Sequence, residues 1–151
     1  FGEQKRVFSM IPGLENAEFV RYGVMHQNTF LQSPKLLDKY YADRRNPLVA
    51  FAGQMTGVEG YVESTASGYL AAVAMAAKVQ GRELPDFPKE TAIGALGQYV
   101  SDESIENFQP MNINFSIIAP LEKRIRKKAE KNLAIAARSL DVIDRLVAKG
   151  I

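Results

Sequence analysis

The residues best suited to chemistry form a glycine-rich loop that leads into a long helix. Residues 53–60 read GQMTGVEG and contain three glycines, Gly53, Gly57 and Gly60. The apolar run LVAFA at 48–52 precedes the loop, and its length and turn-like flanks predict a strand buried on both faces. An alanine-rich helix is predicted over 61–78, with a stop at Gly81. The predicted order is therefore buried strand, glycine-rich loop, helix.

A unit of this kind can present main-chain N–H groups to a ligand. The first turn of a helix leaves its N–H groups unpaired, and the aligned peptide dipoles place partial positive charge there. Glycines let these groups approach an anion or a polar ring with no Cβ in the way. The spacing differs from the G-x-G-x-x-G dinucleotide fingerprint, so it does not identify the ligand by itself. A turn whose glycines only make the bend is an equal alternative.

The other elements follow from periodicity and turn residues. We expect a short helix at 3–10, ended by Pro12 and Gly13, and a strand at 17–22. A helix from Ser33 to about Tyr41 would use Ser33 as its N-cap, with proline in the first turn. The remaining segments are predicted as a linker at 82–90, a helix at 91–100, an irregular stretch at 107–118 and a last helix at 121–149.

Composition excludes several kinds of chemistry. The chain has 151 residues, 46% of them hydrophobic and 24% charged, which is an ordinary globular mix. It has no cysteine, which rules out disulfides, thiolate catalysis and cysteine-ligated metal within it. His26 is the single histidine, so a multi-histidine metal site is excluded and no metal is predicted. No segment has the length or pattern of a membrane span or a targeting signal, and a cytoplasmic location is expected.

Positive charge gathers near the C-terminal end. Residues 121–151 carry a net charge of +5, which leaves −3 for residues 1–120. The densest cluster contains Lys123, Arg124, Arg126 and Lys127, followed by Lys128 and Lys131. Such a cluster could neutralise phosphates, although a solvated helix face is the commoner outcome. No aromatic residue is interleaved with these cations, so base stacking by this segment is not indicated.

Residue identities add a family resemblance. The segment FAGQMTGVEGYVES at 51–64 closely resembles the C-terminal flavin segment of the TrmFO family, the folate- and FAD-dependent tRNA (uracil-5-)-methyltransferases related to the GidA (MnmG) proteins. The resemblance runs without gaps over essentially the whole chain. It includes EQKRVF at 3–8, IPGLENAEF at 11–19, RYGVMH at 21–26, NTF at 28–30 and NFQPMNINF at 107–115.

The resemblance implies an α/β fold. The chain would be the C-terminal part of a Rossmann-like FAD-binding domain of the glutathione-reductase type, followed by C-terminal helices. Residues 1–80 would belong to the flavin-binding portion, and 81–151 would be a linker and helical tail of the same domain. Gly53 and Gln54 would lie near the ribityl and phosphate groups. The pyrimidine edge of the flavin would be met by Thr56, Gly57, Val58, Glu59, Gly60 and Tyr61.

The reaction implied is methylation of C5 of the T-loop uridine of tRNA. Methylenetetrahydrofolate would donate the carbon, reduced FAD would carry it, and NAD(P)H would supply electrons. No catalytic residue is assigned here, because the family's cysteine chemistry would lie in a missing N-terminal part. This piece alone is expected to be inactive and to self-associate through apolar surface normally covered by that part.

Several alternatives stay open. The chain could belong to a GidA-type flavoprotein that modifies the wobble uridine, or it could be a non-catalytic RNA-binding module. His26 could stack on folate or flavin or transfer a proton, or it could be a hydrogen-bonded loop residue. Glu59 and Glu63 lie at a helix start, where carboxylates are favourable without any catalytic role, which is the favoured interpretation for Glu63; for Glu59 a general-base role is an equal alternative.

Overall fold

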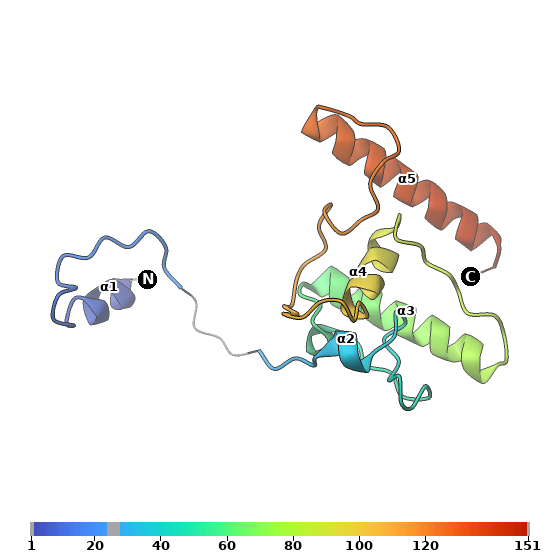
Figure 1. Cartoon of the computed structure of the whole chain (residues 1–151), viewed down its shortest axis with the longest axis horizontal. Coiled ribbons are helices and arrows are strands. Elements are labelled where there is room, and N and C mark those ends of the chain that lie inside the picture. Colours follow the sequence, from blue (N-terminus) through green and yellow to red (C-terminus); the bar gives the residue numbers. More distant parts are fainter. Residues whose placement is uncertain (1, 24–27, 151) are drawn as a thin grey trace.

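The computed structural model describes residues 2–23 and 28–150, and their regular structure is helical (Figure 1). In chain order the elements are α1 (Gly2–Phe8), α2 (Ser33–Leu36), the 3-10 turn η1 (Gln54–Thr56), α3 (Tyr61–Val79), α4 (Ala92–Val100) and α5 (Lys128–Ala148). The predicted helices at 3–10, 61–78 and 91–100 are confirmed within one or two residues. Residues 82–90 form no helix or strand, as the linker prediction required.

The two predicted strands do not form. Across 2–23 and 28–150 the only strand-like pairings are isolated bridges, Leu37 with Asp43, Ala42 with Ala50 and Val58 with Met111. The unit is therefore mostly helical, with few strand contacts, where an α/β fold was expected. Residues 17–22 are irregular, and Phe19 stacks on Tyr22 at a ring separation of 5.4 Å.

The run at 48–52 is instead one arm of a tight hairpin. The N–H of Asp43 donates to the carbonyl of Val49 at 2.8 Å, and the N–H of Phe51 donates to the carbonyl of Tyr41 at 3.0 Å. Leu48 is 70% exposed, so the expectation of burial on both faces is wrong. The physical reason is that a doubly buried strand needs neighbours on both sides, whereas this run has one short partner.

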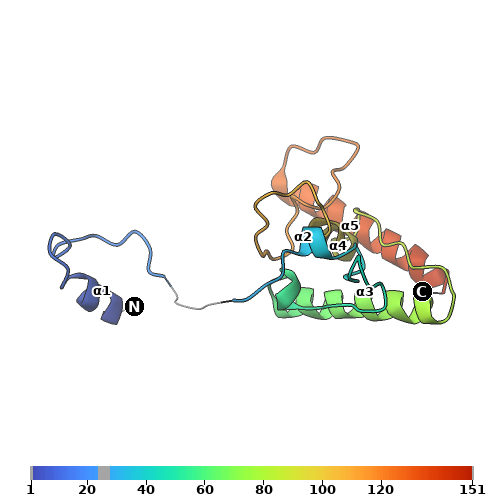
Figure 2. The ribbon, with the colours of Figure 1, turned by 60° about the horizontal axis from the view of Figure 1, so that its bottom comes forward.

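The core lies between α3, α4 and the loops around them. Figures 1 and 2 both show α4 between α3 and α5, whereas α1 and the loop of residues 9–20 lie apart from this body. The main cluster contains Tyr41, Val58, Leu70, Leu96, Val100 and Phe108. A smaller cluster of Ala95, Ile118 and Ile135 joins α5 to α4. Burial raises the pKa of the Tyr41 hydroxyl, which finds no hydrogen-bond partner among the described residues.

Two helices begin or end differently from the prediction. α2 covers only four residues, and Gln32 occupies its N-cap position. Ser33 does not cap the helix, because its Oγ donates to the carbonyl of Thr56 at 2.8 Å. α5 begins at Lys128 and not near Leu121. Arg138 on α5 donates to the carbonyl of Pro120 at 2.7 Å. This bond holds Pro120 against the side of α5, so the chain that follows Pro120 runs beside the helix and does not extend it.

Glycines allow α4 to pack closely. A Cβ added at Gly94 would overlap the main-chain carbonyls of Phe87 and Pro88, and one added at Gly97 would lie 2.5 Å from the carbonyl oxygen of Lys39. By contrast, a Cβ at Gly68 on α3 would have its nearest neighbour, the Cβ of Ala52, at 4.0 Å.

We therefore predict that Gly94→Ala lowers the free energy of unfolding by about 1–3 kcal/mol, because rigid backbone would have to move. Gly68→Ala is the matched control, and we expect it to raise stability by about 0.5–1 kcal/mol, since glycine disfavours a helix interior. Urea denaturation of the complete gene product, followed by circular dichroism, measures both. Equal effects of the two substitutions would contradict the packing described here.

Candidate functional site

The glycine-rich loop is a compact turn that only glycine can make at three points. Gly53, Gly57 and Gly60 have φ angles of 75°, 87° and 100°, in the left-handed region that favours glycine. A Cβ at Gly57 would also overlap the ring of Phe108. The N–H of Thr56 donates to the carbonyl of Gly53 at 2.9 Å and closes the turn.

The protein itself uses some of the loop's N–H groups. Gly53 donates to the Oγ of Ser67 at 2.8 Å, Gly57 to the carbonyl of Gln54 at 3.0 Å, and Glu59 to the carbonyl of Met111 at 3.0 Å. These bonds give the glycines a structural function, which agrees with the alternative that they serve to make the bend.

Other N–H groups of the loop have no acceptor within the described chain. They belong to the exposed residues Gln54, Met55, Gly60 and Tyr61 and to the buried residue Val58. Gly60 is the N-cap of α3 and provides no side chain to cap it, and Tyr61 at the first helical position is 96% exposed. The N-terminus of α3 thus keeps unpaired donors, and the helix dipole adds partial positive charge beside them.

The side chains predicted for this site divide into two groups. Those of Thr56 and Val58 are fully buried and face the core, and the Thr56 hydroxyl donates to the carbonyl of Gly53 at 2.8 Å. These residues shape the turn, so only their main chain could meet a ligand. Gln54 and Tyr61 are exposed at the loop surface. His26, predicted as a tentative site residue, lies outside the described residues.

A second segment, residues 111–113, holds the end of the loop. The N–H of Met111 donates to the carbonyl of Gly57 at 3.1 Å, which completes the parallel bridge beside Val58. The side-chain amide of Asn112 donates to the carbonyl of Glu59 at 3.0 Å. The Glu63 carboxylate accepts the N–H of Ile113 at 3.2 Å, so in this arrangement it joins two segments.

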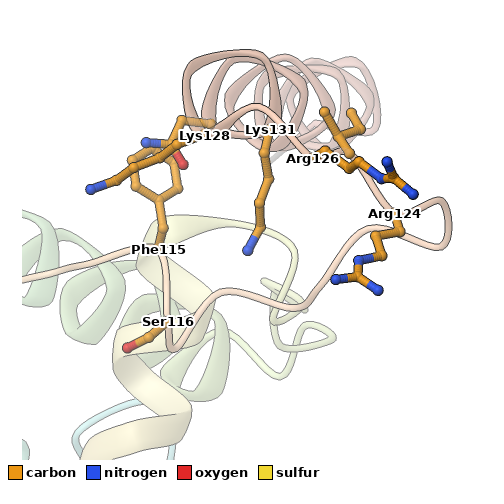
Figure 3. Close-up of a pocket in the computed structure, with 8 residues that line it drawn as sticks. Phe115, Ser116, Arg124, Arg126, Lys128 and Lys131 are labelled. Carbon is orange, nitrogen blue, oxygen red and sulfur yellow. The ribbon is translucent and has the colours of Figure 1, made fainter.

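A second candidate site, here called the basic hollow, lies beside the start of α5. It is an open cavity of about 790 Å³, lined by Phe115, Ser116, Arg124, Ile125, Arg126, Lys128, Lys131 and Asn132. Figure 3 shows Arg124 and Arg126 at one end, Lys128 and the Phe115 ring at the other, and Lys131 extending from the helix between them. No carboxylate lines it, and within the described residues none of its four cations forms an ion pair.

The basic hollow matches the predicted basic cluster only in part. Arg124 and Arg126 line it. Lys123 lines only an adjoining cavity of about 290 Å³ that also contains Glu122, and Lys127 pairs with Glu130 at 2.9 Å. Lys123, Arg124, Arg126 and Lys127 precede α5, so the expectation that they lie on a helix is wrong. No aromatic residue is interleaved with these cations in the sequence, but the fold brings the Phe115 ring beside them from another segment. The alternation of apolar residues around Phe115 carried no signal of this contact.

Two further observations concern metal and membrane. The described part of the chain contains no group of histidine and carboxylate side chains arranged to hold a metal ion. None of its helices combines the length and the apolar character needed to cross a bilayer.

Comparison with known proteins identifies the family. Residues 1–83 match the family model described as glucose inhibited division protein A. The chain belongs to this family. The matched residues include α1, α3 and the whole glycine-rich loop, whereas the segment 111–113 that holds the loop lies beyond them.

Within the family, the chain is similar to proteins named methylenetetrahydrofolate–tRNA-(uracil-5-)-methyltransferase TrmFO. It is 56% identical over 147 residues to the protein of Acetivibrio thermocellus, and the aligned region covers 97% of this chain and 34% of that protein. It is 57% identical over 148 residues to the protein of Streptococcus agalactiae serotype III, and the aligned region covers 97% of the chain and 33% of that protein. The resemblance to TrmFO is confirmed, and the chain spans about a third of the length of these relatives.

The contact between Asn112 and the loop generates a prediction. Asn112→Ala removes the hydrogen bond to the Glu59 carbonyl, and a bond of this kind contributes about 0.5–1.5 kcal/mol. We expect amide hydrogen exchange at Glu59 and Met111 to accelerate by up to about tenfold. Asn107→Ala is the control, because Asn107 is exposed and makes no side-chain bond to the loop. Unchanged exchange in Asn112→Ala would show that the segment does not restrain the loop.

Proposed function

We propose that this chain is the C-terminal part of a flavoenzyme that transfers a one-carbon unit from methylenetetrahydrofolate to C5 of the T-loop uridine of tRNA. The proposal draws on the identity to relatives bearing that printed name. Because the chain spans about a third of those relatives, the activity would belong to the complete protein and not to this part alone.

The observation that carries the proposal is the set of unpaired donors in the loop and at the start of α3. The N–H groups of Gln54 and Met55 in η1, and of Gly60 and Tyr61 at the start of α3, have no acceptor in the described chain, and the three glycines with positive φ leave the main chain there without side chains. A Cβ at Gly53 would have its nearest neighbour, Ser64, at 3.8 Å, so space beside the main chain remains. These features fit the electron-rich edge of an isoalloxazine ring. The helix field would stabilise the negative charge that a reduced flavin carries there.

In this proposal the chain's residues bind and orient the cofactor. Bound FAD would supply the redox and carbon-carrier chemistry, with NAD(P)H as the source of electrons. Gln54, Met55, Gly60 and Tyr61 would meet it through main-chain N–H groups. Gly53, whose own N–H and carbonyl are used within the protein, would let it approach the main chain closely, while Thr56, Gly57, Val58 and Glu59 hold the turn in shape. No catalytic nucleophile is assigned to this chain.

The proposed architecture is a Rossmann-like FAD-binding domain of the glutathione-reductase type. Residues 1–80 would complete the flavin-binding portion, and residues 81–151 would form its linker and helical tail. The hairpin arm at 48–52 would gain strand neighbours from the rest of the protein, since its exposed apolar residues Leu48 and Val49 suit a buried position.

The loop's function is tested by flavin retention. We expect the complete gene product to purify with FAD and Gly60→Ala to lower FAD affinity by about tenfold, because the substitution strains a left-handed residue and pushes on Glu63 and Asn112. Gly81→Ala is the matched control, since Gly81 is also left-handed, with φ 64°, but has open space around it. FAD released by denaturation is read by fluorescence. A colourless protein, or equal flavin loss in both variants, would refute the assignment.

The position of methylation separates the two flavoprotein functions. We expect label from the methylene carbon of methylenetetrahydrofolate to appear at C5 of the T-loop uridine of unmodified tRNA. A GidA-type enzyme would modify the wobble uridine, and a non-catalytic RNA-binding module would leave no label at all. Nuclease mapping of the labelled tRNA distinguishes the three outcomes.

A further inference from the structure

We propose that the basic hollow binds a single-stranded stretch of RNA, with its phosphates on the four cations and one unstacked base against Phe115. The inference rests on the proposed function in taking tRNA as the partner. It goes further in naming the site, the conformation of the RNA and the residue that reads a base face.

The charges of the hollow suit a polyphosphate chain. Arg124, Arg126, Lys128 and Lys131 line one cavity with no carboxylate among the lining residues. Within the described residues none of them forms an ion pair, and the carboxylates nearest to them in the sequence are Glu122, on an adjoining cavity, and Glu130, which is paired with Lys127. Arginine guanidinium groups bind phosphate through two parallel hydrogen bonds, and lysines add mobile point charges.

The position of the cations at α5 supports a binding function. Lys127 is the N-cap of α5 and Lys128 is its first residue, at the end where the helix dipole is already positive. Cations there destabilise a helix, and the carboxylate of the first turn, Glu130, is already paired with Lys127. The main-chain N–H groups of the first turn, residues 128–130, also have no acceptor within the described chain. Positive side chains at the positive end of a helix dipole are expected where selection for binding, and not for stability, determines the residue types.

Phe115 gives the hollow a surface for a base. Its side chain comes from the opposite wall, on the chain that follows the loop-holding segment 111–113, and Phe115 is 43% exposed. Phe115 also lines a neighbouring cavity of about 350 Å³ whose other lining residues are mostly apolar. An exposed ring beside cations is the arrangement by which proteins stack unpaired bases. Bases in an A-form duplex cannot reach such a ring, so the hollow favours single strands.

The test uses the complete gene product and a fluorescently labelled single-stranded RNA decamer, followed by anisotropy at several salt concentrations. We expect Lys131→Gln and Arg126→Gln each to weaken binding by about fivefold or more and to lower the salt slope by about 0.7. Lys35→Gln is the control, because Lys35 is exposed on α2 and makes no ion pair among the described residues. Phe115→Leu should lose about tenfold in affinity, whereas Phe115→Tyr should retain it.

A second measurement excludes misfolding as the cause. Lys128→Gln should melt at the same or a higher temperature than the wild type, since it removes a cation from the positive end of α5, and should still bind RNA more weakly. A lower melting temperature with unchanged RNA affinity would overturn the inference.

Other outcomes also overturn it. Duplex RNA of the same sequence binding as tightly, with no effect of Phe115→Leu, would show simple charge attraction. Competition by polyglutamylated folate, with Lys131→Gln weakening folate and not RNA, would assign the hollow to folate carboxylates. Flavin content and methyl position test the proposed function separately. A colourless protein whose RNA affinity depends on Phe115 and Lys131 would lose the proposed function and keep this site.

Discussion

Two main-chain hydrogen bonds connect the glycine-rich loop to a segment more than fifty residues later. Met111 donates to Gly57 and accepts from Glu59, so one residue spans the turn that precedes α3. Phe108, three residues earlier, packs where a Cβ at Gly57 would lie. Glycine at 57 is therefore required by the loop's own dihedral angle and by the ring that covers it. The core around Val58 and Phe108 depends on this pairing.

The hydrogen bonds of the loop divide its donors into two groups. Glu59 donates to Met111, Gly53 donates to Ser67, and Thr56 and Gly57 donate within the turn, whereas the N–H groups of Gln54, Met55, Gly60 and Tyr61 have no acceptor in the described chain. Of these bonds, the one from Glu59 depends on the segment 111–113. Rigidity and free donors arise together, which is what binding of an electron-rich ring edge requires.

The sequence predicted the elements whose causes are local. α3 follows from its alanine content, and α4 begins where Thr91 accepts the N–H of Gly94 at 3.0 Å, a cap readable from residue type. Features that depend on distant partners were not predictable. Ser33 looks like an N-cap but donates to Thr56, and residues 48–52 look like a buried strand but lack neighbours. Phe115 reached the cations only through the tertiary path of residues 107–121, which periodicity cannot show.

Residues 111–116 connect the two candidate sites and limit the distance between them. Met111 is paired to the loop and Phe115 lines the basic hollow, so only four peptide steps separate them. A fully extended chain covers at most about 3.6 Å per residue, which limits the separation of their Cα atoms to about 14 Å. Insertion or deletion of a single residue here would alter the register of both sites at once. The number of residues between Met111 and Phe115, and not the identity of any one side chain, thus sets the upper limit on the distance between the two candidate sites.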